Sequence, residues 1–422
     1  MNQLWTLVMS VVVLIVSVLS KVNLGWSLLL SSGALLIGAG IEPAGIVNIV
    51  RGIVTDSYFF ELIGINLMIN LLEELLKRVA YFERALQILQ ETFKNRVRIT
   101  AVFPALFGSI PAFGGAKLSA PLVDLAGKDL NIDPVEKSLL NYWFRHIWEM
   151  SSPLFPGVIL AIYFSGIGMG KYILLMLPTT LIFTLLGYLF YLRPVLKKNQ
   201  EALREGAVNG ERQGEADSGF GTGSMLWGLL RIVWPVLLIM LVVVVFEISI
   251  LWPLLLTNLI LLYRMRKDKA FFKGLFTKIW SFQMLLMLFG VFMFKTTFEW
   301  TGMSQVIPTI LAAAGISSIA LIIIFPFLIG LLTGMPSAFV GITYPLLLPV
   351  FNLGGSLHLG AIMLAFVAGH IGTMLSPLHL CLVLTVDYFR IEIFPFWTRL
   401  LYPQIVELLL VLALAFLYGL PG

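Results

Sequence analysis

The chain has 422 residues, of which 59% are hydrophobic and only 12% are charged, and its net charge is +5. A soluble domain carries about a quarter charged residues, so this composition excludes a soluble globular enzyme and a disordered protein. It indicates an all-α polytopic membrane protein. With a single Cys381 we expect neither a disulfide framework nor a Cys-based zinc or iron–sulfur site, and with only four His we expect no metal site.

Ten apolar stretches are long enough to cross the membrane, since a hydrocarbon core of roughly 30 Å needs about 20 helical residues. In chain order these predicted spans are residues 3–20, 24–41, 57–73, 138–165, 171–192, 225–247, 249–264, 279–298, 359–388 and 400–420. We interpret the first as a retained helix, because it lacks the basic start and the small-residue cleavage site of a signal peptide.

Four other segments do not fit a simple span. The apolar stretches 99–122 and 319–350 are interrupted by Gly, Pro and small polar residues, which predicts two re-entrant hairpins that enter and leave the bilayer by the same side. Residues 76–97 alternate apolar and charged faces at helical spacing and predict an interfacial helix. Residues 199–224 are polar and rich in Gly and Glu, which predicts a linker.

The basic residues indicate how the spans are oriented. They gather in the connections 77–98, 193–212 and 264–278, whereas the opposite connections carry only Arg51 and Lys171. Cytoplasmic loops of membrane proteins concentrate Lys and Arg, so we expect a cytoplasmic linker and both termini outside. Orientation accounts for the positive charge, and no nucleic-acid partner is expected.

The two halves of the chain resemble each other. HIWEMSSPLFPGVIL from His146 and HIGTMLSPLHLCLVL from His370 share seven of fifteen positions at an offset of 224 residues. We therefore expect repeat 1 at 1–198, the linker at 199–224 and repeat 2 at 225–422. Five spans per repeat would invert the second copy in the membrane, and such proteins hold their ligand near the midplane where the copies meet. The alternative is a duplication that now serves structure only.

Two kinds of backbone interruption recur in both repeats. The hairpin tips read GSIPAFGGAKLS from Gly108 and LTGMPSAFVGIT from Leu332, and Ser-Pro pairs break long helices at 152–153 and 376–377. Proline cannot donate to the preceding turn, so carbonyls are freed that could bind a cation, and helix N-termini could bind an anion. The alternative is that each proline only bends its helix.

Charged residues in the apolar stretches are costly and mark pathways or partners. Arg145 and Glu149 are four residues apart and could pair, as could Lys295 and Glu299. One interpretation is structural ion pairs, with His146, His370 and His379 as hydrogen-bonded helix contacts. The other is a positive bias for an anionic solute from Arg145, His146 and Lys117, with Glu149 or a His as proton carrier.

These patterns define the candidate site. Substrate- or ion-binding residues are expected to be Gly108, Ser109, Pro111, Gly114, Gly115, Lys117, Ser119, Arg145, His146, Glu149, Ser151, Ser152, Thr333, Gly334, Pro336, Ser337, Thr343, His370, Thr373 and Ser376. The structural helix breaks are expected at Pro153 and Pro377. The sequence carries no nucleophile elbow, phosphate loop or dinucleotide fingerprint, so we expect no enzyme and no catalytic residue.

The paired hairpins and Ser-Pro breaks resemble the ion transporter superfamily, which includes gluconate, citrate and C4-dicarboxylate permeases. The chain looks most like a ten-span bacterial family within it. The resemblance implies a secondary transporter of a small anionic organic solute, coupled to sodium or protons and working by elevator-like alternating access. It also implies a homodimer in the bacterial cytoplasmic (inner) membrane, with no cofactor beyond a coupling sodium ion or proton. The alternative is a cation/proton antiporter.

Overall fold

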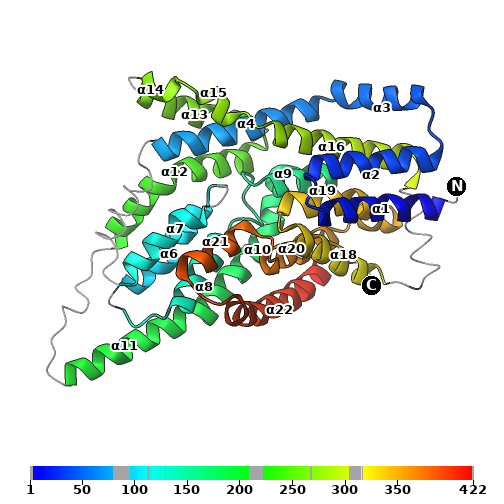
Figure 1. Cartoon of the computed structure of the whole chain (residues 1–422). Coiled ribbons are helices and arrows are strands. Elements are labelled where there is room, and N and C mark those ends of the chain that lie inside the picture. The colour runs from blue at the N-terminus through cyan, green and yellow to red at the C-terminus, as the bar shows by residue number, and fades with distance from the viewer. Residues whose placement is uncertain are drawn as a thin grey trace.

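The computed structural model describes residues 3–78, 96–111, 115–128, 130–208, 222–266, 269–303, 315 and 317–420. Every regular element among these residues is a helix (Figure 1). The chain is thus an all-α polytopic membrane protein. Four of its helical stretches, 169–202, 282–300, 359–389 and 393–417, are long and apolar enough to cross a bilayer alone, and the other apolar helices are shorter.

The first half of the chain contains ten α-helices among the described residues and one π-helical turn. Their bounds are α1 (Gln3–Leu19), α2 (Leu24–Ala39), α3 (Pro43–Thr55), α4 (Ser57–Arg78), α6 (Arg96–Gly108), α7 (Ala116–Ala126), α8 (Pro134–Arg145), α9 (Pro156–Ser165), α10 (Met169–Gly187), the π-helical turn η1 (Tyr188–Leu192) and α11 (Arg193–Val208). Each span predicted there coincides with one helix or with two consecutive helices, and the predicted hairpin 99–122 is α6 and α7.

The second half repeats this order. Its helices are α12 (Thr222–Phe246), α13 (Leu251–Met265), α14 (Lys269–Phe272), α15 (Leu275–Ile279), α16 (Phe282–Trp300), α18 (Ser318–Thr333), α19 (Pro336–Phe351), α20 (Leu359–Leu375), α21 (Leu380–Phe389) and α22 (Ile393–Leu417). A 3₁₀ turn at Leu353–Gly355 follows the second hairpin, which is α18 and α19. The predicted spans of this half are helical over most of their length, and the one at 359–388 is interrupted between α20 and α21.

Three segments differ from the prediction or lie outside the description. The start of the predicted linker is helical, since α11 continues to Val208. Lys197 and Glu201, one turn apart on α11, form an ion pair at 3.7 Å. Helix α12 begins at Thr222, just before the predicted end of the linker. Helix α3 lies in the connection that carries Arg51, between two predicted spans. It starts at Pro43 and buries only Ile49 and Ile53, as an amphipathic surface helix does. The predicted interfacial helix 76–97 lies mostly outside the described residues.

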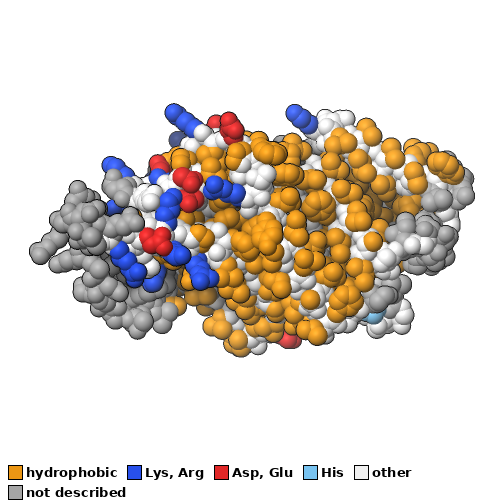
Figure 2. Space-filling view, turned by 90° about the horizontal axis from the view of Figure 1, so that it is seen from below, with side chains coloured by type: hydrophobic (Ala, Val, Ile, Leu, Met, Phe, Trp, Pro, Cys, Tyr) orange, Lys and Arg blue, Asp and Glu red, His pale blue; other side chains and the backbone are white. Residues whose placement is uncertain are grey.

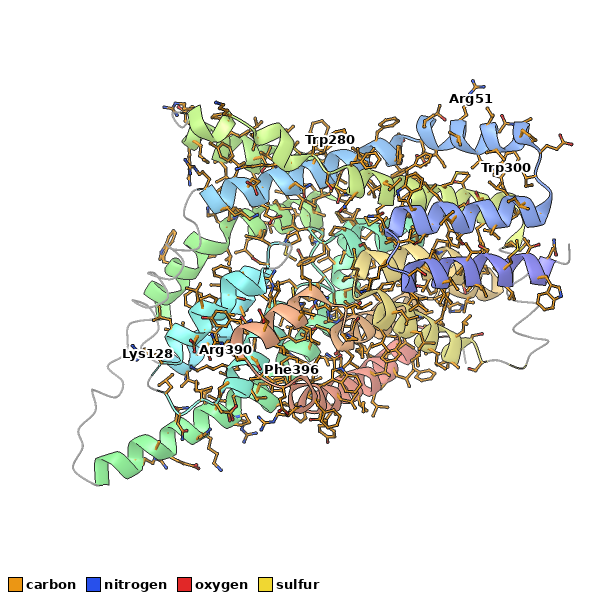
Figure 3. The ribbon with its side chains drawn as sticks, viewed as in Figure 1. Arg51, Lys128, Trp280, Trp300, Arg390 and Phe396 are labelled. Atoms are coloured by element: carbon orange, nitrogen blue, oxygen red, sulfur yellow. The ribbon has the colours of Figure 1, made fainter. Side chains whose placement is uncertain are left out.

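The surface of the molecule defines how it sits in lipid. One face is broadly apolar, and most of the Lys, Arg, Asp and Glu side chains visible on it gather toward one end (Figure 2). Exposed Trp280 and Trp300 flank the 19 residues of α16, which span about 28 Å (Figure 3). Tryptophan favours both membrane–water interfaces, so this spacing matches a bilayer core of roughly 30 Å. Both chain termini lie at the end opposite α11 (Figure 1).

The helices form two groups, seen as the upper and lower parts of Figure 1. The upper group contains α2, α4, α13 and α16, with α2 packed on α16 and α4 packed on α13. The lower group contains the hairpins and the interrupted helices, with α6 on α8 and α18 on α20. Contacts of α16 with α19 and of α1 with α18 join the two groups.

Contacts between helices come in pairs that match the repeat. Gly25 and Leu251 are 226 residues apart, as are Gly64 and Gly290. A Cβ on Gly290 would lie 2.7 Å from the carbonyl oxygen of Gly25, and one on Gly64 would lie 3.4 Å from Cδ1 of Leu251. The α2–α16 contact is therefore repeated by the α13–α4 contact with the halves exchanged.

The hairpins pack on the interrupted helices in the same matched way. A Cβ on Gly108 would collide with the carbonyl oxygen of Arg145, and a Cβ on Gly330 would collide with that of Gly369. Arg145 and Gly369 are also 224 residues apart. At both places two backbones touch because the hairpin helix has no side chain there.

Replacing Gly108 or Gly330 by Ala is expected to destabilise the protein by about 1–3 kcal/mol, because the added methyl must push the hairpin off its partner helix. Gly33→Ala is the matched control, since nothing lies within 4 Å of its Cβ and Ala is the better helix former. Thermal unfolding of purified protein in detergent measures the change. A Gly33→Ala variant as destabilised as the other two would contradict the close approach.

Candidate functional site

Two helices in the lower group are interrupted where the Ser-Pro pairs lie. Helix α8 starts with a capping box between Asp133 and Glu136 and ends at Arg145, and the turns of residues 146–155 lead to α9. Helix α20 ends at Leu375 and α21 starts at Leu380. The predicted breaks at Pro153 and Pro377 are therefore present, and the first is the longer one.

The serine of each Ser-Pro pair forms the same local turn. Ser152 Oγ accepts a hydrogen bond from the Leu154 N–H at 3.4 Å, and Ser376 Oγ accepts one from the Leu378 N–H at 3.1 Å. Ser376 also donates to the carbonyl oxygen of Leu331 at 2.6 Å, which ties the break to hairpin helix α18. The two breaks share this serine turn but differ in how they hold the hairpin.

The carbonyls freed at the end of α20 already have protein donors. Tyr142 Oη donates to Met374 O at 2.8 Å, and Trp397 Nε1 donates to Leu375 O at 2.9 Å. Both donors come from neighbouring helices. The expectation that freed carbonyls at this break stand ready for a cation is not met for these two groups, because side chains satisfy them.

The hairpin tips approach these breaks closely. Gly334 takes a left-handed conformation with φ of 64° at the end of α18, and Pro336 begins α19. In the first hairpin the Arg145 guanidinium packs against Gly115, so a Cβ there would collide with it. Pro111 and Ser337 also lie at the tips; Gly114 and the side chain of Lys117 lie outside the described structure.

Most candidate hydroxyl groups are bonded within the protein. Their oxygens donate to carbonyls three or four residues earlier in the same segment at Ser109, Ser119, Thr333, Thr343 and Thr373. Ser151 Oγ instead accepts from Thr180 at 2.9 Å. These partners favour a structural role for the hydroxyls in this conformation.

A buried charged cluster lies where the two breaks meet. Glu149 Oε1 is 3.8 Å from Nε2 of His146, and Glu149 Oε2 is 3.5 Å from Nε2 of His370. The two histidines occupy equivalent positions of the repeat and are fully buried. The predicted helical spacing of Arg145 and Glu149 is wrong, because α8 ends at Arg145 and turns follow.

Two residues absent from the predicted set join this cluster. His379 Nε2 is 3.0 Å from His146 Nε2, and buried Cys381 lies beside both rings. Their repeat equivalents are Phe155 and Gly157, so the internal symmetry could not single them out. The sequence could have indicated them only through this difference between the repeats, since repeat 2 has His379 and Cys381 where repeat 1 has Phe155 and Gly157.

Other charged groups lie apart from the cluster in the described chain. The predicted pair of Lys295 and Glu299 is present at 3.3 Å and borders a cavity of about 350 Å³ between α16 and α19. Gln404 and Glu407 of α22 are fully buried, and neither side chain has a hydrogen-bond partner among the described residues. Gln404 and Glu407 stand alone in an apolar stretch, and no motif around them indicated a functional site.

The arrangement is similar to a solved transporter. The crystal structure of the Alcanivorax borkumensis YdaH transporter, described as having an unusual topology, matches with a TM-score of 0.59 and 15% sequence identity. The match covers 90% of this chain and 89% of that one, so the two share a fold. No curated protein sequence matches the chain.

A family comparison covers nearly the whole chain. Residues 2–418 match the family described as "Protein of unknown function (DUF401)". The chain belongs to the DUF401 family.

Proposed function

We propose that the protein is a secondary active transporter of a small anionic organic solute, coupled to sodium or protons. The observation that carries this proposal is the position of Glu149, whose carboxylate lies between the two repeat-equivalent histidines where both interrupted helices meet. Ionisable side chains buried in a membrane protein are costly and mark solute or proton pathways. The fold shared with a solved transporter supports the same conclusion.

The proposed mechanism is alternating access by two inverted repeats. The matched contacts, such as Gly25 with Gly290 and Leu251 with Gly64, support a two-fold relation between the halves. Five spans per half would invert the second copy and place the site near the midplane. The cytoplasmic linker, the outside termini and the homodimer in a bacterial inner membrane belong to the same proposal.

Solute access requires movement, because His146 and His370 are fully buried in this conformation. The lower group of helices, which holds the hairpins and breaks, is the proposed moving part, and the upper group is the scaffold. The cavity beside Lys295 and Glu299 lies between α16 of the scaffold and α19 of the hairpin. It is the proposed vestibule on the path to the cluster.

Arg145 favours an anion beside the cluster. A guanidinium carries a positive charge and offers several N–H donors, which suits a carboxylate. The guanidinium packs at Gly115, at the start of α7, where helical N–H groups also favour negative charge. An anionic solute would meet both at this hairpin tip.

Uptake by proteoliposomes tests the proposal. A panel of radiolabelled organic anions is offered under an imposed sodium gradient, an imposed proton gradient or neither. Accumulation of at least one anion that collapses when its gradient is removed is the expected result. Absence of uptake and of counterflow for the whole panel, with correctly inserted protein, would remove the anion proposal.

The second candidate is a cation/proton antiporter, which the contact of Glu149 with two histidines also favours. A carboxylate beside imidazoles can exchange a proton for a cation without any anion. A pH change inside vesicles on addition of sodium, independent of every organic anion, would select this function over the first.

Glu149→Gln is expected to abolish gradient-driven uptake while leaving the protein folded, because Gln keeps the size of the side chain and loses its charge. Removing one partner of a buried charged group costs about 2–5 kcal/mol, which predicts at least about a tenfold loss of rate. Glu201→Gln, in an exposed pair on α11, is the control and should transport normally. Uptake by Glu149→Gln at the level of that control would contradict the role of Glu149.

Ser376→Ala is expected to slow transport more than Ser152→Ala, because only Ser376 bonds to the hairpin at Leu331 O. Leaving that buried carbonyl without its donor costs about 1–3 kcal/mol. Transport rate and thermal stability are measured together. Ser165→Ala, which removes a hydroxyl bonded only to its own helix, is the control. Equal effects of Ser376→Ala and the control would count against the hairpin tie.

A further inference from the structure

Three side chains of metal-ligating type converge where the interrupted helices cross. His146 ends α8, His379 precedes α21, and Cys381 lies in the first turn of α21. One ring nitrogen of each histidine and Cys381 Sγ all lie within 4.8 Å of one another. Both histidines are buried, and Cys381 is 8% exposed. Residues from both halves of the chain therefore meet at one point.

Backbone carbonyls set the tautomers of both histidines. His146 Nδ1 is 2.5 Å from Tyr142 O, and His379 Nδ1 is 2.8 Å from Gly334 O. A carbonyl oxygen can only accept, so each Nδ1 carries the proton and donates it. In a neutral imidazole the Nε2 then carries a lone pair.

Those two Nε2 atoms face each other at 3.0 Å. Two lone pairs at that separation repel unless a positively charged species lies between them. A histidine that binds a metal through one nitrogen almost always donates the other N–H to a carbonyl or carboxylate, and both histidines already do so. The backbone thus holds both rings in the orientation that metal ligands require.

The spacing also suits a tetrahedral ion. Zn–N bonds of about 2.0–2.1 Å at a tetrahedral angle place two nitrogens about 3.3 Å apart, so the rings need to separate by only a few tenths of an ångström. Glu149 Oε1 lies 3.8 Å from His146 Nε2 but does not belong to the group of three atoms that converge. Two imidazoles and a thiolate would hold the ion, and water would take the fourth position.

We propose that His146, His379 and Cys381, with Glu149 beside them, form a binding site for a divalent transition-metal ion of the zinc class. Thiolate and imidazole prefer such ions to sodium, magnesium or calcium. The thiolate and the carboxylate supply two negative charges, so the ion can be neutralised away from bulk water. The site would join the ends of α8 and α21 across the two halves, and it does not depend on which solute is moved.

Metal analysis of the full-length protein in detergent tests the site. The protein is stripped with a chelator, loaded with Zn²⁺ or Co²⁺ and freed of excess metal before elemental analysis and absorption spectroscopy. About one equivalent of Zn²⁺ per chain is expected, and the Co²⁺ form should show a thiolate-to-cobalt charge-transfer band.

Three variants separate the ligands from the rest of the protein. His379→Ala should weaken Zn²⁺ binding by more than about 100-fold, since loss of a ligand exceeds the loss of a supporting hydrogen bond. Cys381→Ser, a conservative change, should remove the charge-transfer band. His358→Ala is the matched control, because this histidine bonds Gly419 O far from the cluster in sequence and should leave binding unchanged.

Failure of the protein to retain metal would contradict the proposal. If the two rings share a proton and bind no metal, folded wild-type protein will retain neither Zn²⁺ nor Co²⁺ above the level of His379→Ala. Gel filtration and thermal unfolding establish that each variant is folded. Because the measurement involves no transport, a failed metal site leaves the proposed transport function standing, and a failed uptake assay leaves the metal site standing.

Discussion

Backbone carbonyls and amides inside a bilayer have no water to bind, and this constraint decides where the irregular segments of the chain can lie. The interruption at 146–155 is almost entirely enclosed by other helices, and in the one at 376–379 the polar Ser376 and His379 are buried while Pro377 and Leu378 are exposed. Tyr142 and Trp397 supply donors to carbonyls that α20 can no longer satisfy. A helix can therefore be interrupted inside the bilayer only where side chains of neighbouring helices form hydrogen bonds with its unpaired backbone groups.

Close backbone packing and the polar cluster depend on each other. Gly108 and Gly330 let the hairpin helices touch α8 and α20, and that contact brings Gly334 O within reach of His379. The carbonyl then orients the ring toward His146. The absence of a side chain at Gly330 of α18 thus contributes to the orientation of the His379 ring through direct contacts alone.

Hydropathy, length and breaker residues predict most of the helical segments and the interruptions near the Ser-Pro pairs, because these features are local. The sequence did not predict helix α3, because α3 is too short and too polar on one face to resemble a membrane span. The predicted helical spacing of Arg145 and Glu149 is wrong because it holds only while the helix continues, and α8 stops at Arg145. Cys381 could not be placed beside His146, since no local pattern relates residues 235 positions apart that meet only through the fold.

The helix that ends the first half is longer than a membrane is thick. The stretch 169–202 has 34 residues, about 50 Å, against a hydrocarbon core of roughly 30 Å. Its last turns, in α11, therefore extend beyond the length that a hydrocarbon core can cover, and α11 projects from the rest of the helices (Figure 1). The charged pair of Lys197 and Glu201 on these turns needs no burial in the bilayer for the helix to span it.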